Sequence, residues 1–218
     1  MPYAVRKMRS ADIPQAIEID RECFPPQWPA PPYERDLRSN PVAHYLVAHE
    51  TTKRAVPMAK TSLQKFTLGR LFGKLKNSVR DRGPYRTTQR IDGVIGFWMM
   101  ADEAHIMTLG VLQRCRRQGI GELLLISAID LAIQLNARIM TLEVGSSNRS
   151  AQALYGKYGF TNVGVRRGYY GENREDAVIM STDTITSGSF QELFQRAKKS
   201  YAEKQATDLP QNSKIWEY

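Results

Sequence analysis

The hydrophobic pattern of this chain predicts strands and helices in mixed order. Seven short segments either alternate between apolar and polar residues or are largely apolar, which is typical of strands with one or both faces buried. They are residues 3–9, 42–50, 92–101, 103–112, 138–145, 160–167 and 176–183. Helices are predicted over residues 11–24, 120–135 and 148–159. This mixture predicts an α/β or α+β fold.

A glycine-containing turn leads into the most apolar of the predicted helices. It consists of Arg116, Arg117, Gln118, Gly119, Ile120 and Gly121. A helix start presents unpaired N–H groups and the positive end of the helix dipole, and glycine lets the backbone approach a ligand closely. With two arginines beside it, the turn fits a diphosphate, although a tight turn without a ligand has the same pattern. The G-x-x-x-x-G-K-S/T and G-x-G-x-x-G patterns are absent, which argues against a kinase or a dehydrogenase.

The net charge of +9 comes from one segment of the chain. Residues 53–90 contain eleven of the 31 basic residues and one acidic residue, which leaves 20 basic and 21 acidic residues elsewhere. Because the segment separates two predicted strands, it is an inserted loop. Within it, residues 63–79 form an amphipathic basic stretch, but a solvated loop fits the same composition. The expected partner of this loop is a ribosome or another acidic surface.

Composition excludes two classes of protein. Cys23 and Cys115 are the two cysteines among 218 residues, which excludes a disulfide-rich secreted scaffold. The longest purely aliphatic run, Leu123–Ile126, is four residues, whereas a membrane-spanning helix needs ~20. The first twenty residues carry charges throughout and lack the apolar core of a secretory signal. We therefore expect a cytoplasmic protein without a transmembrane segment.

Two segments flank or interrupt the predicted sheet. Residues 24–33 form a proline-rich loop whose aromatic residues, Trp28 among them, either line a groove or cap the core. Residues 184–218 form a C-terminal tail, in which a capping box at 189–192 predicts a helix over 189–205.

Three sequence motifs point to one enzyme family. Arg116, Gly119 and Gly121 fill the pattern Q/R-x-x-G-x-G/A. The run TLEVGSSNRSAQALYGKYGF, residues 141–160, is similar to L-E-V-x-x-S-N-x-x-A-x-x-L-Y-x-x-x-G-F, and residues 166–180 are similar to R-R-x-Y-Y followed by E-D-A-x-x-M. In this order, the motifs resemble those of the GCN5-related N-acetyltransferases (GNAT), and within them the RimI-type ribosomal-protein-alanine N-acetyltransferases.

The resemblance implies a fold and a cofactor site. The implied GNAT fold is a mixed, mostly antiparallel sheet flanked by helices and splayed between its fourth and fifth strands. It would occupy residues 1–183, with the basic loop 53–90 inserted. The implied cofactor is acetyl-CoA, the acetyl donor. Its implied contacts are Leu109, Gly110, Val111, Arg116, Arg117, Gln118, Gly119, Ile120, Gly121 and Asn148.

The resemblance also implies residues for chemistry and for substrate. Glu143 matches the general base of the family and Tyr155 the general acid, although alone they fit a solvent-facing strand residue and a core tyrosine. Asn148 also fits a helix N-cap. Tyr169 and Tyr170 match the tyrosines that border the substrate peptide, to which we add Trp28.

The expected reaction is transfer of the acetyl group of acetyl-CoA to the α-amine of a protein N-terminus, such as an N-terminal alanine of a ribosomal protein. Acetylation of lysine or of a small amine is an alternative, as is a noncatalytic module that binds acyl-CoA or RNA. No metal site is expected, because His44, His49 and His105 lack cysteine or carboxylate partners at ligand spacing.

Overall fold

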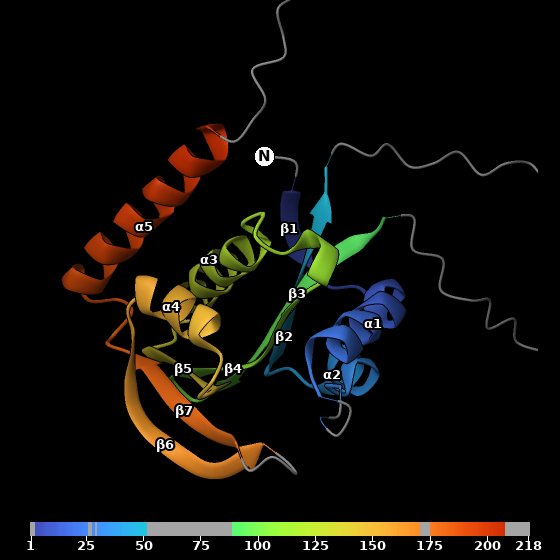
Figure 1. Cartoon of the computed structure of the whole chain (residues 1–218), viewed down its shortest axis with the longest axis horizontal. Helices are drawn as coiled ribbons and strands as arrows, with labels where there is room; N and C mark the ends of the chain where they lie inside the picture. Colours follow the sequence, from blue (N-terminus) through green and yellow to red (C-terminus); the bar gives the residue numbers. More distant parts are fainter. Residues whose placement is uncertain (1–2, 26–27, 29, 52–88, 171–174, 208–218) are drawn as a thin grey trace, which may run out of the picture.

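A mixed sheet of seven strands forms the centre of the molecule (Figure 1). The computed structural model describes residues 3–25, 28, 30–51, 89–170 and 175–207. The strands are β1 (Tyr3–Lys7), β2 (Ala43–Glu50), β3 (Ile91–Met100), β4 (Glu103–Val111), β5 (Ile139–Gly145), β6 (Phe160–Tyr170) and β7 (Glu175–Thr182). Their order is β1-β2-β3-β4-β5-β7-β6; β4 and β5 are parallel, and the other neighbours are antiparallel. This confirms the mixed, mostly antiparallel sheet expected from the sequence.

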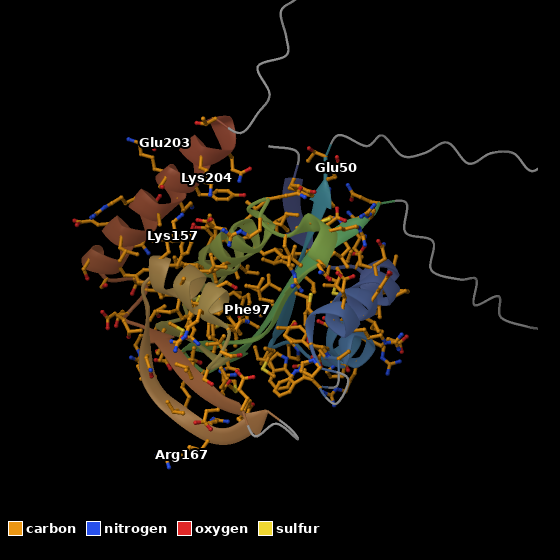
Figure 2. All side chains as sticks on the ribbon, in the orientation of Figure 1. Glu50, Phe97, Lys157, Arg167, Glu203 and Lys204 are labelled. Carbon is orange, nitrogen blue, oxygen red and sulfur yellow. The ribbon has the colours of Figure 1, made fainter. Side chains whose placement is uncertain are left out.

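Helices cover both faces of the sheet (Figure 1). They are α1 (Ile13–Cys23), α2 (Tyr33–Ser39), α3 (Ile120–Gln134), α4 (Arg149–Lys157) and α5 (Gly188–Thr207), with short 3-10 turns at Ser10–Asp12 and Gln113–Cys115. α1 and α2 lie on one side, and α3, α4 and α5 on the other. The hydrophobic core lies between these layers, with the fully buried Phe97 of β3 near its centre (Figure 2). α2 was not predicted; it begins directly after Pro31 and Pro32, where proline's fixed φ suits a helix start.

The parallel strands β4 and β5 diverge partway along their length. They pair only over the first part of β4, residues Glu103–Ile106. The register of β3 against β4 then shifts between Gly96 and Phe97, which leaves Met107 as an extra residue in β4. Such a bulge bends a strand and ends regular pairing. The second half of β4 therefore has an edge that does not pair with β5, which is the splay implied by the resemblance.

The C-terminal helix α5 packs against the rest of the fold. Its buried side chains are Phe190, Phe194, Ala197 and Tyr201. Phe194 meets Tyr158 edge-on, with ring centroids 6.2 Å apart, and Lys198 Nζ lies 2.9 Å from an Asp130 carboxylate oxygen of α3. A helix thus occupies the segment where the capping box predicts one, and it shares the core of the sheet.

Most of the basic segment 53–90 lies outside the described residues. The strands on either side of it, β2 and β3, are antiparallel neighbours, with Ala48 opposite Gly93. The segment is therefore an insertion between adjacent strands, as its position in the sequence predicts. Among the described helices, none has the length and apolar character needed to cross a bilayer.

Candidate active site

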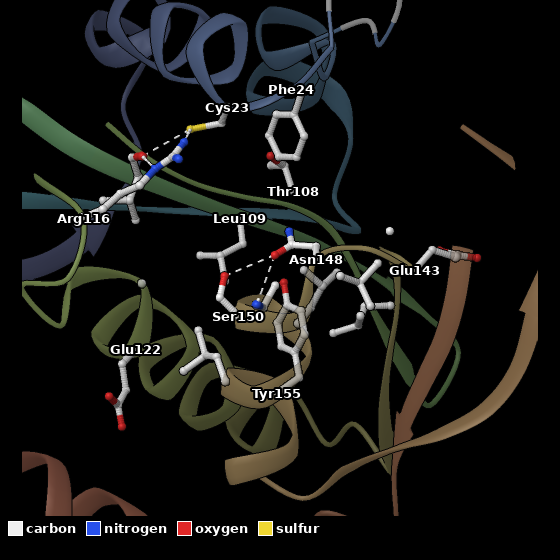
Figure 3. Close-up of a pocket in the computed structure, with 18 of the residues that line it drawn as sticks. Cys23, Phe24, Thr108, Leu109, Arg116, Glu122, Glu143, Asn148, Ser150 and Tyr155 are labelled. Carbon is white, nitrogen blue, oxygen red and sulfur yellow. Dashed lines mark hydrogen bonds between the residues drawn. The ribbon is translucent and has the colours of Figure 1, made fainter. Parts of the chain in front are cut away.

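A cavity of about 800 Å³ opens where β4 and β5 separate. Arg116 and Glu143 lie toward opposite ends of it, with Leu109, Asn148 and Tyr155 between them (Figure 3). Small-molecule sites in proteins are commonly roughly 300–1,000 Å³, so this cavity has the size of a ligand site. The sequence-predicted residues that line it are Trp28, Leu109, Val111, Arg116, Arg117, Gly119, Ile120, Gly121, Glu143, Asn148, Tyr155 and Tyr169.

The turn before α3 has a backbone conformation that favours glycine. Gly119 caps the helix with φ of 81°, and Arg117 has φ of 64°. A Cβ atom at Gly119 would lie 2.4 Å from Nε2 of Gln205, so a larger residue does not fit there without a shift. Because the N-cap residue is Gly119, no N-cap side chain occupies the N–H groups at the start of α3. Its first N–H groups are therefore suited to an anion.

Arg116 is held against the cavity wall by the strand end and by α1. Its Nε donates to the Val111 carbonyl at 3.1 Å, and its guanidinium lies 3.7 Å from the Cys23 Sγ. Burial, opposed by the Arg116 guanidinium, raises the pKa of the Cys23 thiol, which keeps it neutral. Arg116 thus brings a fixed positive charge to the same end of the cavity as the Gly119 turn.

Two predicted cofactor residues lie outside the cavity lining. Gly110 faces α1, and a Cβ atom there would lie 2.9 Å from Ile19 Cγ2. Gln118 accepts a hydrogen bond from the Tyr3 hydroxyl at 3.1 Å and donates one to the Arg114 carbonyl at 3.3 Å. The side chain of Gln118 therefore stabilises the turn.

Glu143 lies within a group of polar side chains at the other end of the cavity. Its carboxylate is 3.0 Å from His105 Nε2 and 3.2 Å from an Arg166 guanidinium nitrogen, and its side chain is 10% exposed. Nδ1 of His105 lies 2.8 Å from the Thr141 hydroxyl, which fixes the orientation of the imidazole ring. Glu143 is therefore a positioned, nearly buried carboxylate, not the solvent-facing strand residue of the alternative interpretation.

Asn148 and Tyr155 come from α4. The Asn148 side chain caps the helix, because its Oδ1 accepts from the Ala151 N–H at 3.2 Å and from the Ser150 hydroxyl at 3.3 Å. Tyr155 is 7% exposed, and its ring centroid lies 5.7 Å from that of Phe160. Its hydroxyl points into the same part of the cavity as the Asn148 amide (Figure 3).

Two of the three predicted substrate residues meet beside Glu143. The rings of Trp28 and Tyr169 have centroids 5.8 Å apart, although 141 positions separate them in the sequence. The Arg166 guanidinium carbon lies 5.5 Å from the Tyr169 ring centroid, within range of a cation–π interaction. The third, Tyr170, ends β6, where its backbone pairs with Glu175; its side chain is outside the described part of the structure.

Sequence reasoning missed two residues that contact Glu143, namely His105 and Arg166. In the sequence, His105 has no cysteine or carboxylate partner at ligand spacing, so no functional role is predicted for it. Its carboxylate partner, Glu143, reaches it through the parallel pairing of β4 with β5, which brings His105 opposite Thr141. Arg166 belongs to the R-R-x-Y-Y motif, but nothing in the sequence indicates its contact with Glu143. Among the described residues, no group of His, Cys, Asp or Glu side chains is arranged to hold a metal ion.

Known proteins resemble this chain in sequence and in structure. The model of the acetyltransferase (GNAT) family matches residues 13–160. A relative from Bacillus subtilis (strain 168), provisionally named a ribosomal protein bS18-alanine N-acetyltransferase, is 32% identical over 177 residues, which covers 81% of this chain and 93% of the relative. An N-alpha-acetyltransferase from Saccharolobus solfataricus is 27% identical over 180 residues, which covers 82% of this chain and 92% of the relative.

Solved structures share the fold as well. The crystal structure of the ribosomal-protein-S18-alanine N-acetyltransferase from Escherichia coli has a TM-score of 0.60 and 22% identity, covering 85% of this chain and 96% of that one. The family match over residues 13–160, the extent of the Bacillus subtilis relative and this fold agree with one another. The chain belongs to the GNAT acetyltransferase family and is an acetyl-CoA-dependent N-acetyltransferase.

Proposed function

We propose that this enzyme acetylates the α-amine of a protein N-terminus, with the N-terminal alanine of ribosomal protein bS18 as the first candidate. The observation that carries the proposal is the single cavity that joins the Gly119 turn to Glu143 along the unpaired edge of β4. The names of the relatives support the choice of substrate, since they describe bS18-alanine and N-alpha acetylation.

The residues at the Arg116 end of the cavity fit the diphosphate of acetyl-CoA. Arg116 and Arg117 supply positive charge, and the main chain of Gly119, Ile120 and Gly121 supplies N–H groups at the start of α3. Gly121 lines the cavity, and a Cβ atom there would lie 3.6 Å from Val111 Cγ2, in ordinary van der Waals contact. Gln118 contributes by holding the turn in shape.

The main chain of β4 fits the arm of the cofactor that carries the thioester. Leu109, Gly110 and Val111 follow the bulge, where β4 no longer pairs with β5. The N–H and C=O groups that these residues present on that edge are available to a bound chain as another strand would be, except the Val111 carbonyl, which Arg116 and Cys23 already contact. Asn148 lines the cavity opposite them, with its cap to α4 made through Oδ1 alone. Acetyl-CoA, when bound, supplies the activated acetyl group.

Glu143 and Tyr155 are the proposed base and acid. The amine nitrogen forms a bond to the acetyl carbon, and the carbon–sulfur bond of the thioester breaks. Glu143 accepts the proton that the nitrogen loses, and Tyr155 donates a proton to the departing thiolate. His105 and Arg166 position the Glu143 carboxylate, because each contacts one of its two oxygens.

An α-amine is the easier nucleophile for this chemistry. Its pKa is about 7.7–8.0, so roughly a tenth of it is neutral at pH 7, whereas a lysine with a pKa of about 10.4 is below ~0.1% neutral. Trp28 and Tyr169 lie at the Glu143 end of the cavity and suit contact with the first residues of a peptide, with Tyr170 next to them in sequence. These aromatic residues would help to exclude water from the amine.

The test is acetyl transfer to matched peptides. One peptide begins with the N-terminal residues of bS18 and has a free α-amine and an internal lysine; a second has the same sequence with a blocked N-terminus; spermidine represents small amines. We expect thiol release from acetyl-CoA with the first peptide alone, and a mass increase on its N-terminal fragment. Transfer to the blocked peptide or to spermidine at a comparable rate would instead support lysine or small-amine acetylation. Binding of acetyl-CoA without transfer to any amine would support the noncatalytic module.

The basic loop 53–90 is a proposed docking element for the ribosome or another acidic surface. The charge of the loop supports this proposal, and most of its residues lie outside the described part of the chain. Enzyme lacking residues 60–86 should acetylate a free bS18 peptide normally. With intact ribosomal particles, the rate of the wild type should fall steeply as salt is added, because salt weakens contacts with phosphates. The rate of the shortened enzyme should depend much less on salt.

A further inference from the structure

The end of α5 contacts the turn that precedes α3. The Tyr201 hydroxyl donates to the Gly119 carbonyl at 3.2 Å, and Nε2 of Gln205 lies 3.5 Å from the Gln118 carbonyl oxygen. Tyr201 is 5% exposed. α5 lies beyond residues 13–160, which the family model matches, so this contact is an addition to the part of the chain that carries the family motifs.

These contacts help to orient two peptide units of the turn, together with the hydrogen bond that the Leu123 N–H of α3 donates to the Gly119 carbonyl at 2.9 Å. In a trans peptide, the C=O and N–H groups point to opposite sides. Because α5 takes the carbonyls of Gln118 and Gly119, the N–H groups in the same units, those of Gly119 and Ile120, point away from α5. Burial, with a smaller effect from Glu122, raises the pKa of Tyr201 to about 12. Its hydroxyl therefore remains a donor at neutral pH.

Lys204 lies between these two residues in the sequence and borders the cavity. It is the residue of α5 that lines the cavity, together with Arg116, Arg117 and Gly119, and Figure 2 shows it near the C-terminal end of the helix. The acidic residue in the first turn of α3, Glu122, is paired with Lys157 and accepts a hydrogen bond from the Tyr158 hydroxyl at 2.7 Å. The charge at this end of the cavity is therefore positive.

We propose that α5 is part of the acetyl-CoA site: Lys204 contacts a phosphate group of coenzyme A, and Tyr201 and Gln205 hold the Gly119 turn in its anion-binding conformation. This inference rests on the proposed placement of the diphosphate at that turn. Lys204 is a binding residue, because it would touch the cofactor. Tyr201 and Gln205 are positioning residues, because they act through the turn.

The experiment measures coenzyme A affinity by calorimetry in the full-length protein at low salt. Lys204→Gln should raise the Kd for coenzyme A about fivefold, the size expected for a solvent-exposed ion pair. Tyr201→Phe should raise it to a similar extent by loosening the turn. Lys199→Gln is the matched control, since Lys199 is also an exposed lysine of α5, 4.0 Å from Glu203 and not in contact with the cavity; its Kd should equal that of the wild type.

Two further measurements separate a cofactor role from a structural one. For Lys204→Gln and Tyr201→Phe, the KM for acetyl-CoA should rise while kcat at saturation stays at the wild-type value. The same titrations with 3′-dephospho-coenzyme A locate the contact. If Lys204→Gln still raises the Kd, Lys204 contacts the diphosphate; if the Kd no longer changes, Lys204 contacts the 3′-phosphate. Either result supports the proposal.

The proposal is overturned if Lys204→Gln, which changes only an exposed side chain, binds coenzyme A as tightly as the wild type and the Lys199→Gln control. That result would leave the proposed function intact, because the wild type still binds. A wild type that shows no saturable binding of acetyl-CoA would instead overturn the proposed function itself.

Discussion

At the scale of single residues, the proposed chemistry depends on how Glu143 is held. As the proposed base, this carboxylate must lie in a fixed place at the end of the cavity to accept a proton from a bound amine. Contacts with His105 and Arg166 restrict both of its oxygens, and the side chain is only 10% exposed. The motif identified Glu143 and Tyr155 from the sequence. It did not identify His105, because His105 and Glu143 are 38 positions apart in the sequence and meet only through the pairing of β4 with β5.

Removing the proposed proton-transfer groups should reduce turnover without affecting cofactor binding. Glu143→Gln and Tyr155→Phe should each lower kcat about 10²-fold or more, because positioned acids and bases contribute that much. The measurements are steady-state kinetics with the bS18-derived peptide and calorimetry with coenzyme A. The Kd for coenzyme A should stay within about twofold of the wild-type value.

The control for the tyrosine is Tyr158→Phe in the residue that follows α4. Tyr158 does not itself line the cavity, and its hydroxyl donates to Glu122 at 2.7 Å, at the end of the cavity away from Glu143. This variant should lower the free energy of unfolding by about 1 kcal/mol and leave kcat unchanged. Wild-type turnover in Glu143→Gln and Tyr155→Phe would show that the chemistry is performed by other groups.

At the scale of elements, the Gly119 turn and the divergence of β4 from β5 make the cavity. The turn could be anticipated from the sequence, because glycine adopts positive φ and its place between a strand and an apolar helix is a local feature. The sequence predicts α3 as a helix but not how much of it is buried. Leu124 and Ala128 are buried, and so are Leu125 and Ile129, because the sheet covers one side of α3 and α4 and α5 lie on the same face of the sheet.

Substitution at two glycines should affect stability in opposite directions. Gly119→Ala should lower the free energy of unfolding by about 1 kcal/mol or more, because φ is 81° and a Cβ would lie 2.4 Å from the Gln205 amide. Gly156→Ala should raise it by about 0.5 kcal/mol, because Gly156 is in α4 with no neighbour within 4 Å of the added atom.

Urea unfolding measures both effects, and coenzyme A binding should weaken only in Gly119→Ala. Equal stability of the two variants would mean that the turn adapts to a side chain at residue 119.

At the scale of the whole molecule, buried carboxylates connect the sheet to the helices and make stability depend on pH. Burial acts to raise the pKa of Asp12, but hydrogen bonds from Arg6 at 2.7 and 2.9 Å and from the Arg9 N–H at 2.8 Å outweigh it and lower the pKa. A carboxyl whose pKa is lowered by folding stabilises the protein above its unfolded pKa, about 3.9 for aspartate. This contribution is lost as the pH falls through the lowered, folded-state pKa.

The corresponding variant is Asp12→Asn. It should lower the free energy of unfolding at pH 7 by about 2 kcal/mol, the size of hydrogen bonds to a charged group. The difference from the wild type should shrink progressively below about pH 4, as followed by urea unfolding at a series of pH values. Asp102→Asn is the control, because the Asp102–Arg138 pair is 56% exposed on both sides, and it should have a smaller effect. A difference for Asp12→Asn that stays constant with pH would exclude the ionised carboxylate as its source.

The seven strands, the helices other than α2, the glycine turn and the family could all be predicted from the sequence, because hydrophobic spacing, turn residues and contiguous motifs are local properties of the chain. Tertiary structure alone decided which distant residues share the cavity. The meeting of Trp28 with Tyr169, the contact of His105 with Glu143 and the approach of α5 to the Gly119 turn each join segments far apart in the sequence. Those contacts follow from strand pairing and helix packing, which the free energy of the whole fold sets and no short segment encodes.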